Sequence, residues 1–202
     1  MKVKNVNIGL YFGSFNPVHV GHLALANYIV ENSILDEIWF IVSPQNPYKS
    51  KSDLIEALHR VNMLEASITN YSKFKVCDIE LNLPTPSYSY TTLRELSKIH
   101  PTYNFTIIMG SDNLKELDRW KNIDEIINNY NILVYPRPGY EIKPDELNQN
   151  ISSIDAPVFD IDSTTIRKGL KEGKNYPFMI PKEAHQYIYS NNLYISNEKQ
   201  KL

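Results

Sequence analysis

The sequence predicts an α/β protein with a Rossmann-like, doubly wound, mostly parallel sheet and helices on both faces. Short β-rich runs alternate with segments of helical periodicity along the chain. One run, EIWFIVS at 37–43, is almost continuously apolar, as a strand buried on both faces is. Several runs stop at glycine or proline, which is typical of a strand that gives way to a loop and a helix.

The first half of the chain alternates strand and helix. Each expected strand is a β-rich or apolar run, and each expected helix repeats apolar residues at intervals of three or four. In order, these elements are a strand at 6–12 before Gly13, a helix at 18–31, a strand at 37–43 before Pro44, a helix from the N-cap Asp53 to Ile68, a weaker strand at 74–79 and a helix at 87–99 after Pro86.

The second half continues the pattern with shorter elements. Residues 139–156 are polar and are expected to form a surface excursion. The elements around this excursion are a strand at 104–109 before Gly110, helices at 114–120 and 123–129, a strand at 131–135 before Pro136, a short last strand at 157–161, a helix at 162–171 capped by Asp162 or Ser163, and a helix at 181–191 with proline in its first turn. We expect a single domain over 1–195 and a frayed tail at 196–202.

Length, charge and composition limit the classes of function. The 202 residues fit one domain, and the formal net charge of −2 predicts no general attraction to nucleic acid or to an anionic membrane. No run approaches the roughly 18 apolar residues that a membrane span needs. Cys77 is the only cysteine, which excludes an intramolecular disulfide and a zinc site of several thiolates and leaves the reducing cytoplasm as the expected location. The sequence leaves open whether the chain forms a homo-oligomer.

The first strand-to-helix junction carries the strongest chemical signal. It reads GSFNPVHVGH over 13–22, with His19 and His22 three residues apart and Gly21 between them. This spacing places both imidazoles on one face at a helix N-terminus, where free N–H groups and the positive end of the helix dipole favour phosphate. The junction matches neither the dinucleotide fingerprint nor the P-loop.

The junction resembles the H-x-G-H signature of the nucleotidyltransferase superfamily, whose histidines stabilise the α-phosphate of a nucleoside triphosphate under attack. Class I aminoacyl-tRNA synthetases carry a related signature, and residues 49–52 (KSKS) superficially resemble their second lysine motif. In those enzymes the motif lies far downstream in a much longer chain. A near-neutral chain of 202 residues without room for tRNA recognition argues against them.

Further segments resemble nicotinate-nucleotide adenylyltransferases and cover almost the whole chain. They are residues 46–49 (NPYK), 58–64 (LHRVNML), 86–93 (PSYSYTTL), 107–112 (IIMGSD) with Trp120 downstream, 135–139 (YPRPG) and 161–167 (IDSTTIR). We interpret residues 58–64 as an amphipathic core helix. The chain departs from the family pattern at Tyr48, Ser89, Thr91 and Asp162, where the family has histidine, threonine, aspartate and serine.

Some of these residue types also suit nucleotides on physical grounds. A strand that ends in Gly110 lets a nucleotide approach the backbone, and Asp112 can accept hydrogen bonds from ribose hydroxyls. The indole of Trp120 can stack on a pyridine ring. The segment from Arg167 to Lys174 carries a local charge of +3 in a chain of net charge −2, which suits a triphosphate. We expect Asp162 to cap its helix, because an extra carboxylate facing a triphosphate would repel it.

The resemblance implies an enzyme that joins ATP and nicotinate mononucleotide into deamido-NAD with release of pyrophosphate, aided by Mg²⁺ bound mainly through the ATP phosphates. It implies catalytic roles for His19, His22, Lys49 and Arg167. It implies an ATP site formed by Gly13, Ser14, Phe15, Gly21, Gly110, Asp112, Ser163 and Thr164. It implies a nicotinate mononucleotide site formed by Ser89, Thr92, Trp120 and Arg137.

Two alternatives stay open at the level of sequence. One is another H-x-G-H enzyme, a phosphopantetheine adenylyltransferase or a cytidylyltransferase, although those chains are usually shorter and lack the pairing of Asp112 with Trp120. The other is a nucleotide sensor without turnover, against which both histidines, Lys49 and Arg167 argue. The preference for nicotinate over nicotinamide mononucleotide is also left open.

Overall fold

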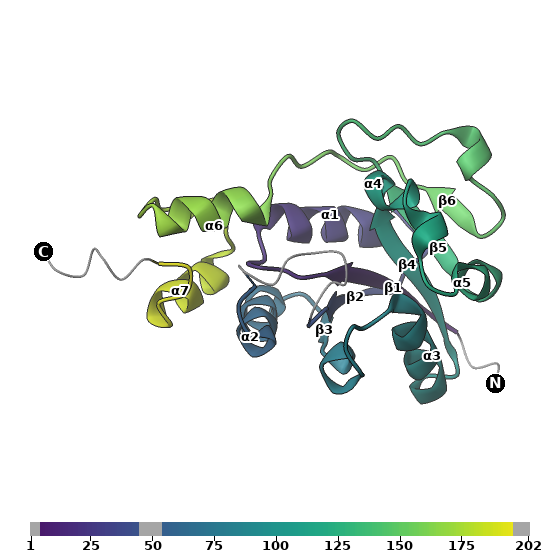
Figure 1. The fold of residues 1–202 in the computed structure, drawn as a ribbon, viewed down its shortest axis with the longest axis horizontal. Coiled ribbons are helices and arrows are strands. Elements are labelled where there is room, and N and C mark those ends of the chain that lie inside the picture. The colour runs from purple at the N-terminus through teal and green to yellow at the C-terminus, as the bar shows by residue number, and fades with distance from the viewer. Residues whose placement is uncertain (1–4, 45–53, 196–202) are drawn as a thin grey trace, which may run out of the picture.

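The computed structural model describes residues 5–44 and 54–195, which form a parallel β-sheet covered by helices (Figure 1). All six strands of this sheet run parallel in the order β3-β2-β1-β4-β5-β6, which confirms the expected fold class. The strands are β1 Val6–Gly13, β2 Glu37–Val42, β3 Phe74–Cys77, β4 Tyr103–Gly110, β5 Asn131–Tyr135 and β6 Ile151–Ser153.

Helices cover both faces of the sheet. The helices that bury side chains on one face are α1 Val20–Glu31, α2 Ala57–Ile68, α6 Ser163–Lys171 and α7 Lys182–Ser190. Those that pack on the opposite face are α3 Ser89–Ile99, α4 Ser111–Leu114 and α5 Ile123–Asn129. Single turns of 3₁₀ helix lie at η1 Ile79–Asn82, η2 Leu117–Arg119 and η3 Pro144–Glu146.

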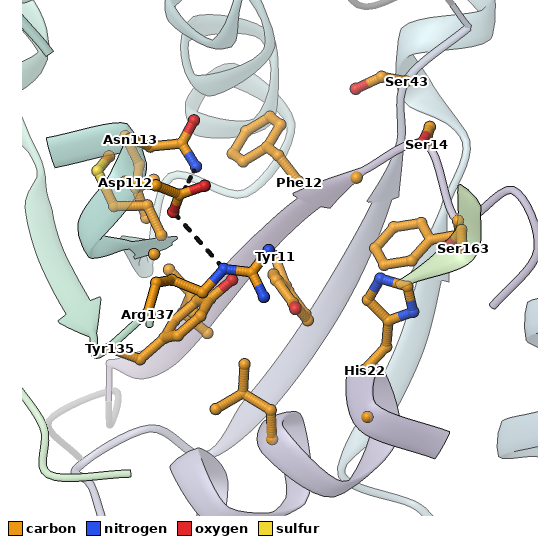
Figure 2. A pocket seen from close by; sticks show the side chains of 18 of the residues that line it. Tyr11, Phe12, Ser14, His22, Ser43, Asp112, Asn113, Tyr135, Arg137 and Ser163 are labelled. Carbon is orange, nitrogen blue, oxygen red and sulfur yellow. Dashed lines mark hydrogen bonds and ion pairs between the residues drawn. The ribbon is translucent and has the colours of Figure 1, made fainter. Parts of the chain in front are cut away.

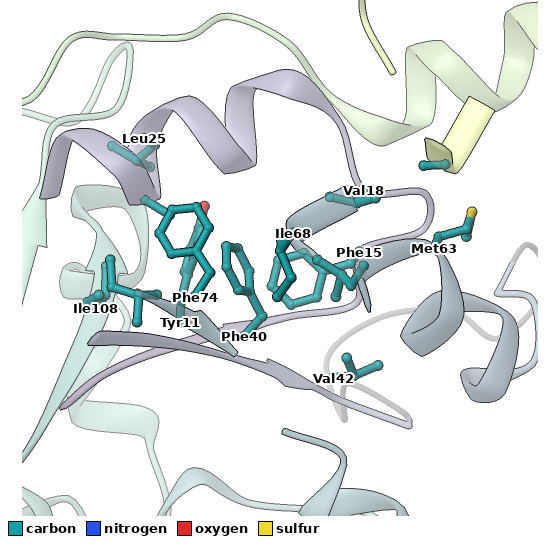
Figure 3. Close-up of a cluster of buried hydrophobic side chains, with 14 of the residues drawn as sticks. Tyr11, Phe15, Val18, Leu25, Phe40, Val42, Met63, Ile68, Phe74 and Ile108 are labelled. Carbon is teal, nitrogen blue, oxygen red and sulfur yellow. The ribbon is translucent and has the colours of Figure 1, made fainter. Parts of the chain in front are cut away.

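The apolar strands form the centre of two hydrophobic cores. On β2, Phe40 faces the core beneath α1 and α2, whereas Trp39 and Ile41 face the core beneath α3. Figure 3 shows the first of these cores, in which the rings of Tyr11, Phe40 and Phe74 lie between α1 and the strands. Burial of β2 on both faces explains why its sequence is continuously apolar.

The structure corrects three expected elements. The last strand is β6 at Ile151–Ser153, inside the expected surface excursion, and residues 157–161 form no regular element. Only Ile151 of β6 is buried, so this strand gives little apolar signal. The helix expected at 114–120 is instead the short α4 followed by the turn η2. Helix α2 begins at Ala57, after an N-cap position at Glu56; the expected cap Asp53 lies outside the described residues.

The strand order fixes where a ligand can bind. From β1 the chain proceeds to β2 and β3 on one side, and then to β4, β5 and β6 on the other. The connections after β1 and β4 therefore diverge at the carboxyl ends of these two neighbouring strands. A crevice opens between diverging connections, and ligands of open α/β sheets bind there.

Candidate active site

A cavity of about 520 Å³ opens at this divergence. Its volume lies within the range of roughly 300 to 1,000 Å³ that small-molecule sites have. Figure 2 shows side chains that line it from five elements or their ends: Tyr11 and Phe12 from β1, His22 from α1, Asp112 and Asn113 after β4, Arg137 after β5, and Ser163 from α6.

The cavity brings together most of the residues that the sequence predicts for the site. Those that line it are Gly13, Ser14, Phe15, His19, Gly21, His22, Ser89, Gly110, Asp112, Trp120, Arg137, Ser163, Thr164 and Arg167. Lys49 and its neighbour Tyr48 lie outside the described residues. Thr92, predicted to bind the acceptor, is placed elsewhere: it is fully buried and does not line the cavity.

The two histidines of the first junction are stacked on one another. Their ring centroids are 3.6 Å apart with an interplanar angle of 24°. His19 is the N-cap of α1, and its backbone N–H donates to Nδ1 of His22 over 3.2 Å. In the neutral ring of His22 the proton is therefore on Nε2, because Nδ1 accepts a hydrogen bond.

His19 is neutral at physiological pH. Only 5% of its surface is exposed, and burial lowers its pKa to about 4, with Arg137 lowering it further and Asp162 opposing the shift. Its Nδ1 has no hydrogen-bond partner within the described part of the chain. Gly21 leaves room for this ring, because a Cβ at position 21 would lie 3.1 Å from Nδ1 of His19.

The N-terminus of α6 faces the histidine junction. Asp162 accepts from the backbone N–H of Thr165 over 2.9 Å, which confirms that it caps the helix. This backbone hydrogen bond is the main reason why the pKa of Asp162 is lowered. Ser163 donates to the carbonyl of Pro17 over 2.9 Å, so the start of α6 is attached to the loop before α1.

Arg167, one turn further along α6, contacts the same loop. Its Nη1 donates to the carbonyl of Asn16 over 2.8 Å, and its Nη2 donates to Oγ1 of Thr164 over 3.3 Å. Its Nε is buried and has no partner among the residues that the structure describes. Buried polar groups without partners are rare and often occur at functional sites, so this nitrogen and Nδ1 of His19 both mark the junction between α1 and α6.

A fully buried arginine holds the loops next to the cavity in place and was not predicted from the sequence. Arg60 on α2 is fully buried. Its Nη1 donates to the carbonyls of Ser14 and Ser43, over 2.6 and 2.8 Å, just beyond the ends of β1 and β2, and its Nε donates to Ile55 over 3.2 Å. Burial lowers its pKa to about 10, which keeps the guanidinium charged at neutral pH.

The opposite wall of the cavity carries a carboxylate and a guanidinium. Oδ1 of Asp112 lies 3.7 Å from Nε of Arg137, as the dashed line in Figure 2 marks. Both approach Gly110 so closely that a Cβ there would lie 2.3 Å from Asp112 Oδ1 and 2.8 Å from Arg137 Cγ. Behind them, the buried rings of Tyr11 and Tyr135 meet edge to face at 6.2 Å, and burial raises the pKa of both hydroxyls.

A further part of the lining, the aromatic end of the cavity, is formed by Trp120, Tyr88 and Ser89. The ammonium of Lys121, which also lines the cavity, lies 4.5 Å from the centroid of the Tyr88 ring. The start of α3 is held here by a buried carboxylate, Glu80, which the sequence did not single out. Glu80 accepts from Ser87 over 2.8 Å and from Thr92 over 2.7 Å. Thr92 therefore helps to fix Glu80, which lines the cavity, without lining the cavity itself.

Comparisons with known proteins agree with this arrangement. The family model described as Cytidylyltransferase-like matches residues 10–168. A probable nicotinate-nucleotide adenylyltransferase of Flavobacterium johnsoniae is 46% identical over 94% of this chain and 99% of its own length. A protein of the same description from Bacteroides fragilis is 42% identical over 89% of this chain and 90% of its own length.

Solved structures give the same picture. Plasmodium falciparum nicotinic acid mononucleotide adenylyltransferase complexed with NaAD has a TM-score of 0.77 and 25% identity, over 94% of this chain and 98% of that one. The same protein complexed with APC matches equally well. Within the described residues, no helix of the chain is long and apolar enough to cross a membrane.

Proposed function

Because the chain belongs to the cytidylyltransferase-like family, and within it to the nicotinate-nucleotide adenylyltransferases, we propose that its stacked histidines and Arg167 carry out adenylyl transfer. The chain joins the AMP moiety of ATP to nicotinate mononucleotide and so forms deamido-NAD and pyrophosphate for NAD biosynthesis. The observation that carries our assignment of residues is the position of the histidine stack. It lies at the N-terminus of α1 and lines the same cavity as Trp120 and Arg167.

The reaction needs positioning and charge stabilisation more than it needs a nucleophilic side chain. A phosphate oxygen of the mononucleotide attacks the α-phosphorus of ATP in line. The new bond between oxygen and phosphorus forms while the bond from the α-phosphorus to the bridging oxygen breaks, and pyrophosphate leaves with that electron pair. Negative charge grows on the leaving oxygens, so fixed N–H donors and cations lower the barrier.

The chain supplies those donors at the junction of α1 and α6. His22 donates from Nε2–H to an oxygen of the α-phosphate, since its Nδ1 is occupied by the His19 backbone. The neutral ring of His19 holds the His22 ring in place by stacking, and the positive ends of α1 and α6 add to the attraction. Arg167 stabilises charge on the β- and γ-phosphates, together with Lys49.

The remaining lining residues divide between the two substrates. Ser14, Phe15 and the glycines at 13, 21 and 110 line the part of the cavity that we assign to ATP. The hydroxyl of Thr164 is a donor to the triphosphate, and Ser163, whose hydroxyl already donates to Pro17, offers its backbone N–H at the start of α6. Asp112 binds ribose hydroxyls, and Arg137 binds the phosphate of the mononucleotide. Ser89 and Trp120 hold the pyridine ring at the aromatic end, and Thr92 supports that end through Glu80.

The donor set at this cavity fits a Mg²⁺ ion that is held mainly by ATP. No group of three or more His, Cys, Asp or Glu side chains suited to a metal occurs among the described residues. The lining is instead rich in imidazole, guanidinium and hydroxyl groups, which suit phosphate oxygens. Bound in this way, Mg²⁺ would neutralise phosphate charge and keep most of its water ligands.

We propose the cytoplasm as the place of action. The single Cys77 is half-buried, and burial raises its pKa to about 11, so it remains an unreactive thiol. A chain with one inert thiol and ATP as a substrate suits a reducing compartment.

An acceptor comparison tests the proposed function. Purified chain is incubated with Mg²⁺, ATP and one acceptor at a time: nicotinate mononucleotide, nicotinamide mononucleotide or phosphopantetheine. We expect pyrophosphate and deamido-NAD in equal amounts with nicotinate mononucleotide and a lower kcat/KM with the other two. CTP in place of ATP should give little product. Faster turnover with phosphopantetheine, or with CTP, would contradict the proposal, and binding without pyrophosphate release would indicate a sensor.

A further inference from the structure

The loop that joins β1 to α1 is held in a strained conformation by side chains from distant parts of the chain. Phe15 adopts a φ of 44°, in the left-handed region that residues with side chains seldom occupy. The carbonyls of Ser14, Asn16 and Pro17 accept from Arg60, Arg167 and Ser163 respectively. Strained backbone persists only where its surroundings fix it, and this loop leads directly into His19.

One further contact to this loop comes from the end of the described chain. The hydroxyl of Tyr194 donates to Oδ1 of Asn16 over 2.7 Å, across a sequence separation of 178 residues. Tyr194 is only 9% exposed and belongs to the hydrophobic core beneath α1. Tyr194 also has a φ of 60°, so the backbone of the turn after α7 is strained at the residue whose ring enters the core.

The position of Tyr194 separates it from the substrates. Asn16 lines the cavity, whereas Tyr194 does not. Burial raises the pKa of the Tyr194 hydroxyl above its ordinary value, so the group remains a protonated donor throughout the neutral range. The hydrogen bond to Asn16 therefore links Tyr194 to the cavity lining, and the nearby guanidiniums of Arg167 and Arg60 oppose the pKa shift that burial causes.

We propose that Tyr194 is a positioning residue for adenylyl transfer, which fixes Asn16 and thereby the loop that presents the histidine pair to the α-phosphate. Tyr194 thus adds a hydrogen bond to the Asn16 side chain, beside the bonds that Arg167 and Ser163 of α6 make to backbone carbonyls of the same loop. This proposal rests on the proposed function of the cavity.

The test compares two tyrosines that differ in which part of the molecule their hydroxyls contact. Tyr194→Phe removes the bond to Asn16. Tyr187→Phe removes a hydroxyl on α7 that contacts Nδ1 of His59 over 3.0 Å and Nδ2 of Asn62 over 2.9 Å, outside the cavity. Both changes delete one oxygen from a tyrosine near the end of the chain, so Tyr187→Phe is a matched control.

We expect Tyr194→Phe to lower kcat by about fivefold or more, the equivalent of one lost hydrogen bond in the transition state, while KM for nicotinate mononucleotide changes less than twofold. Tyr187→Phe should keep kcat within twofold of the wild type. The melting temperature of each variant, measured by calorimetry, shows whether stability explains a loss. A kcat of Tyr194→Phe within twofold of the wild type would overturn the proposal, and so would equal losses of kcat in both variants.

A double-mutant cycle with Asn16→Ala gives a second measurement. If Tyr194 acts through Asn16, then adding Tyr194→Phe to Asn16→Ala lowers kcat no further. Additive losses would mean that Tyr194 acts by another route. Wild-type turnover in the same assay separates this outcome from failure of the proposed function, because without adenylyl transfer the wild type itself releases no pyrophosphate.

Discussion

The imidazole rings of His19 and His22 are stacked with their centroids 3.6 Å apart, and His19 is almost completely buried. Two protonated rings at this separation would repel each other strongly in a desolvated site. Burial lowers the pKa of His19 to about 4, so at neutral pH this ring carries no charge. His19 therefore acts through stacking and orientation, and Arg167 supplies positive charge at the junction.

The buried neutral state of His19 predicts a pH dependence of stability. The unfolded chain binds a proton at position 19 below about pH 6.5, whereas the folded chain binds one only below about pH 4. Stability from this group is complete above pH 6.5 and is lost as the pH falls towards 4, by up to about 3 kcal/mol. His19→Asn should flatten this part of the profile in urea unfolding at pH 7.5, 5.5 and 4.5.

His100→Asn controls for the loss of a histidine as such. His100 lies just before the amino-terminal end of β4, whereas the cavity lies at the carboxyl ends of the strands, and its ring stacks on Tyr103. A profile for His19→Asn as steep as that of the wild type would show that His19 is not held neutral by the fold.

Gly21→Ala should separate activity from stability. Alanine favours the helical state over glycine by about 1 kcal/mol, so the free energy of unfolding should not fall by much. A Cβ would nevertheless lie 3.1 to 3.2 Å from the His19 ring and 3.4 Å from Phe159, so the buried ring must move by a few tenths of an ångström. We expect kcat to fall about tenfold, as measured by pyrophosphate release.

Asn27→Ala is the control on the exposed face of the same helix, and it should leave kcat unchanged. If Gly21→Ala has wild-type kcat, then the spacing of the histidine stack does not matter for catalysis.

Trp120→Leu should weaken the binding of nicotinate mononucleotide and leave the binding of ATP unchanged. Stacking on an aromatic side chain contributes about 1 to 3 kcal/mol for a nucleobase, and a pyridine ring is comparable. We therefore expect KM for nicotinate mononucleotide to rise about tenfold and KM for ATP to stay within twofold. The chain's other tryptophan, Trp39, is buried in the core beneath α3, so Trp39→Phe tests for general destabilisation. Equal increases in both KM values would show that Trp120 does not bind the acceptor specifically.

Local signals predicted most of the fold. Strand β2 was predicted because burial on both faces made it continuously apolar, and Asp162 was predicted as a cap from its place before a helical segment. Strand β6 was missed because two of its three residues are exposed serines. The apolar residues at 157–161 gave a stronger strand signal, yet Val158 and Phe159 line the cavity from a loop.

The parts of the site that could not be predicted depend on contacts between distant residues. Arg60 lies in an ordinary amphipathic helix, and its partners are backbone carbonyls, which no sequence motif reveals. The contact from Tyr194 to Asn16 spans nearly the whole chain. Thr92 was placed in the acceptor site by resemblance alone, but its hydroxyl turns to the buried Glu80. Motifs therefore identified the residues that line the cavity, whereas the residues that hold them in place were found only from the structure.

The most direct test of the account is the turnover of His22→Ala with ATP, nicotinate mononucleotide and Mg²⁺, measured as pyrophosphate and deamido-NAD formed per enzyme. Removal of a fixed donor to a developing negative charge costs on the order of 3 kcal/mol. We therefore predict that kcat falls at least about a hundredfold, with an unchanged circular dichroism spectrum and melting temperature. A turnover number close to that of the wild type would contradict the central role of the histidine pair.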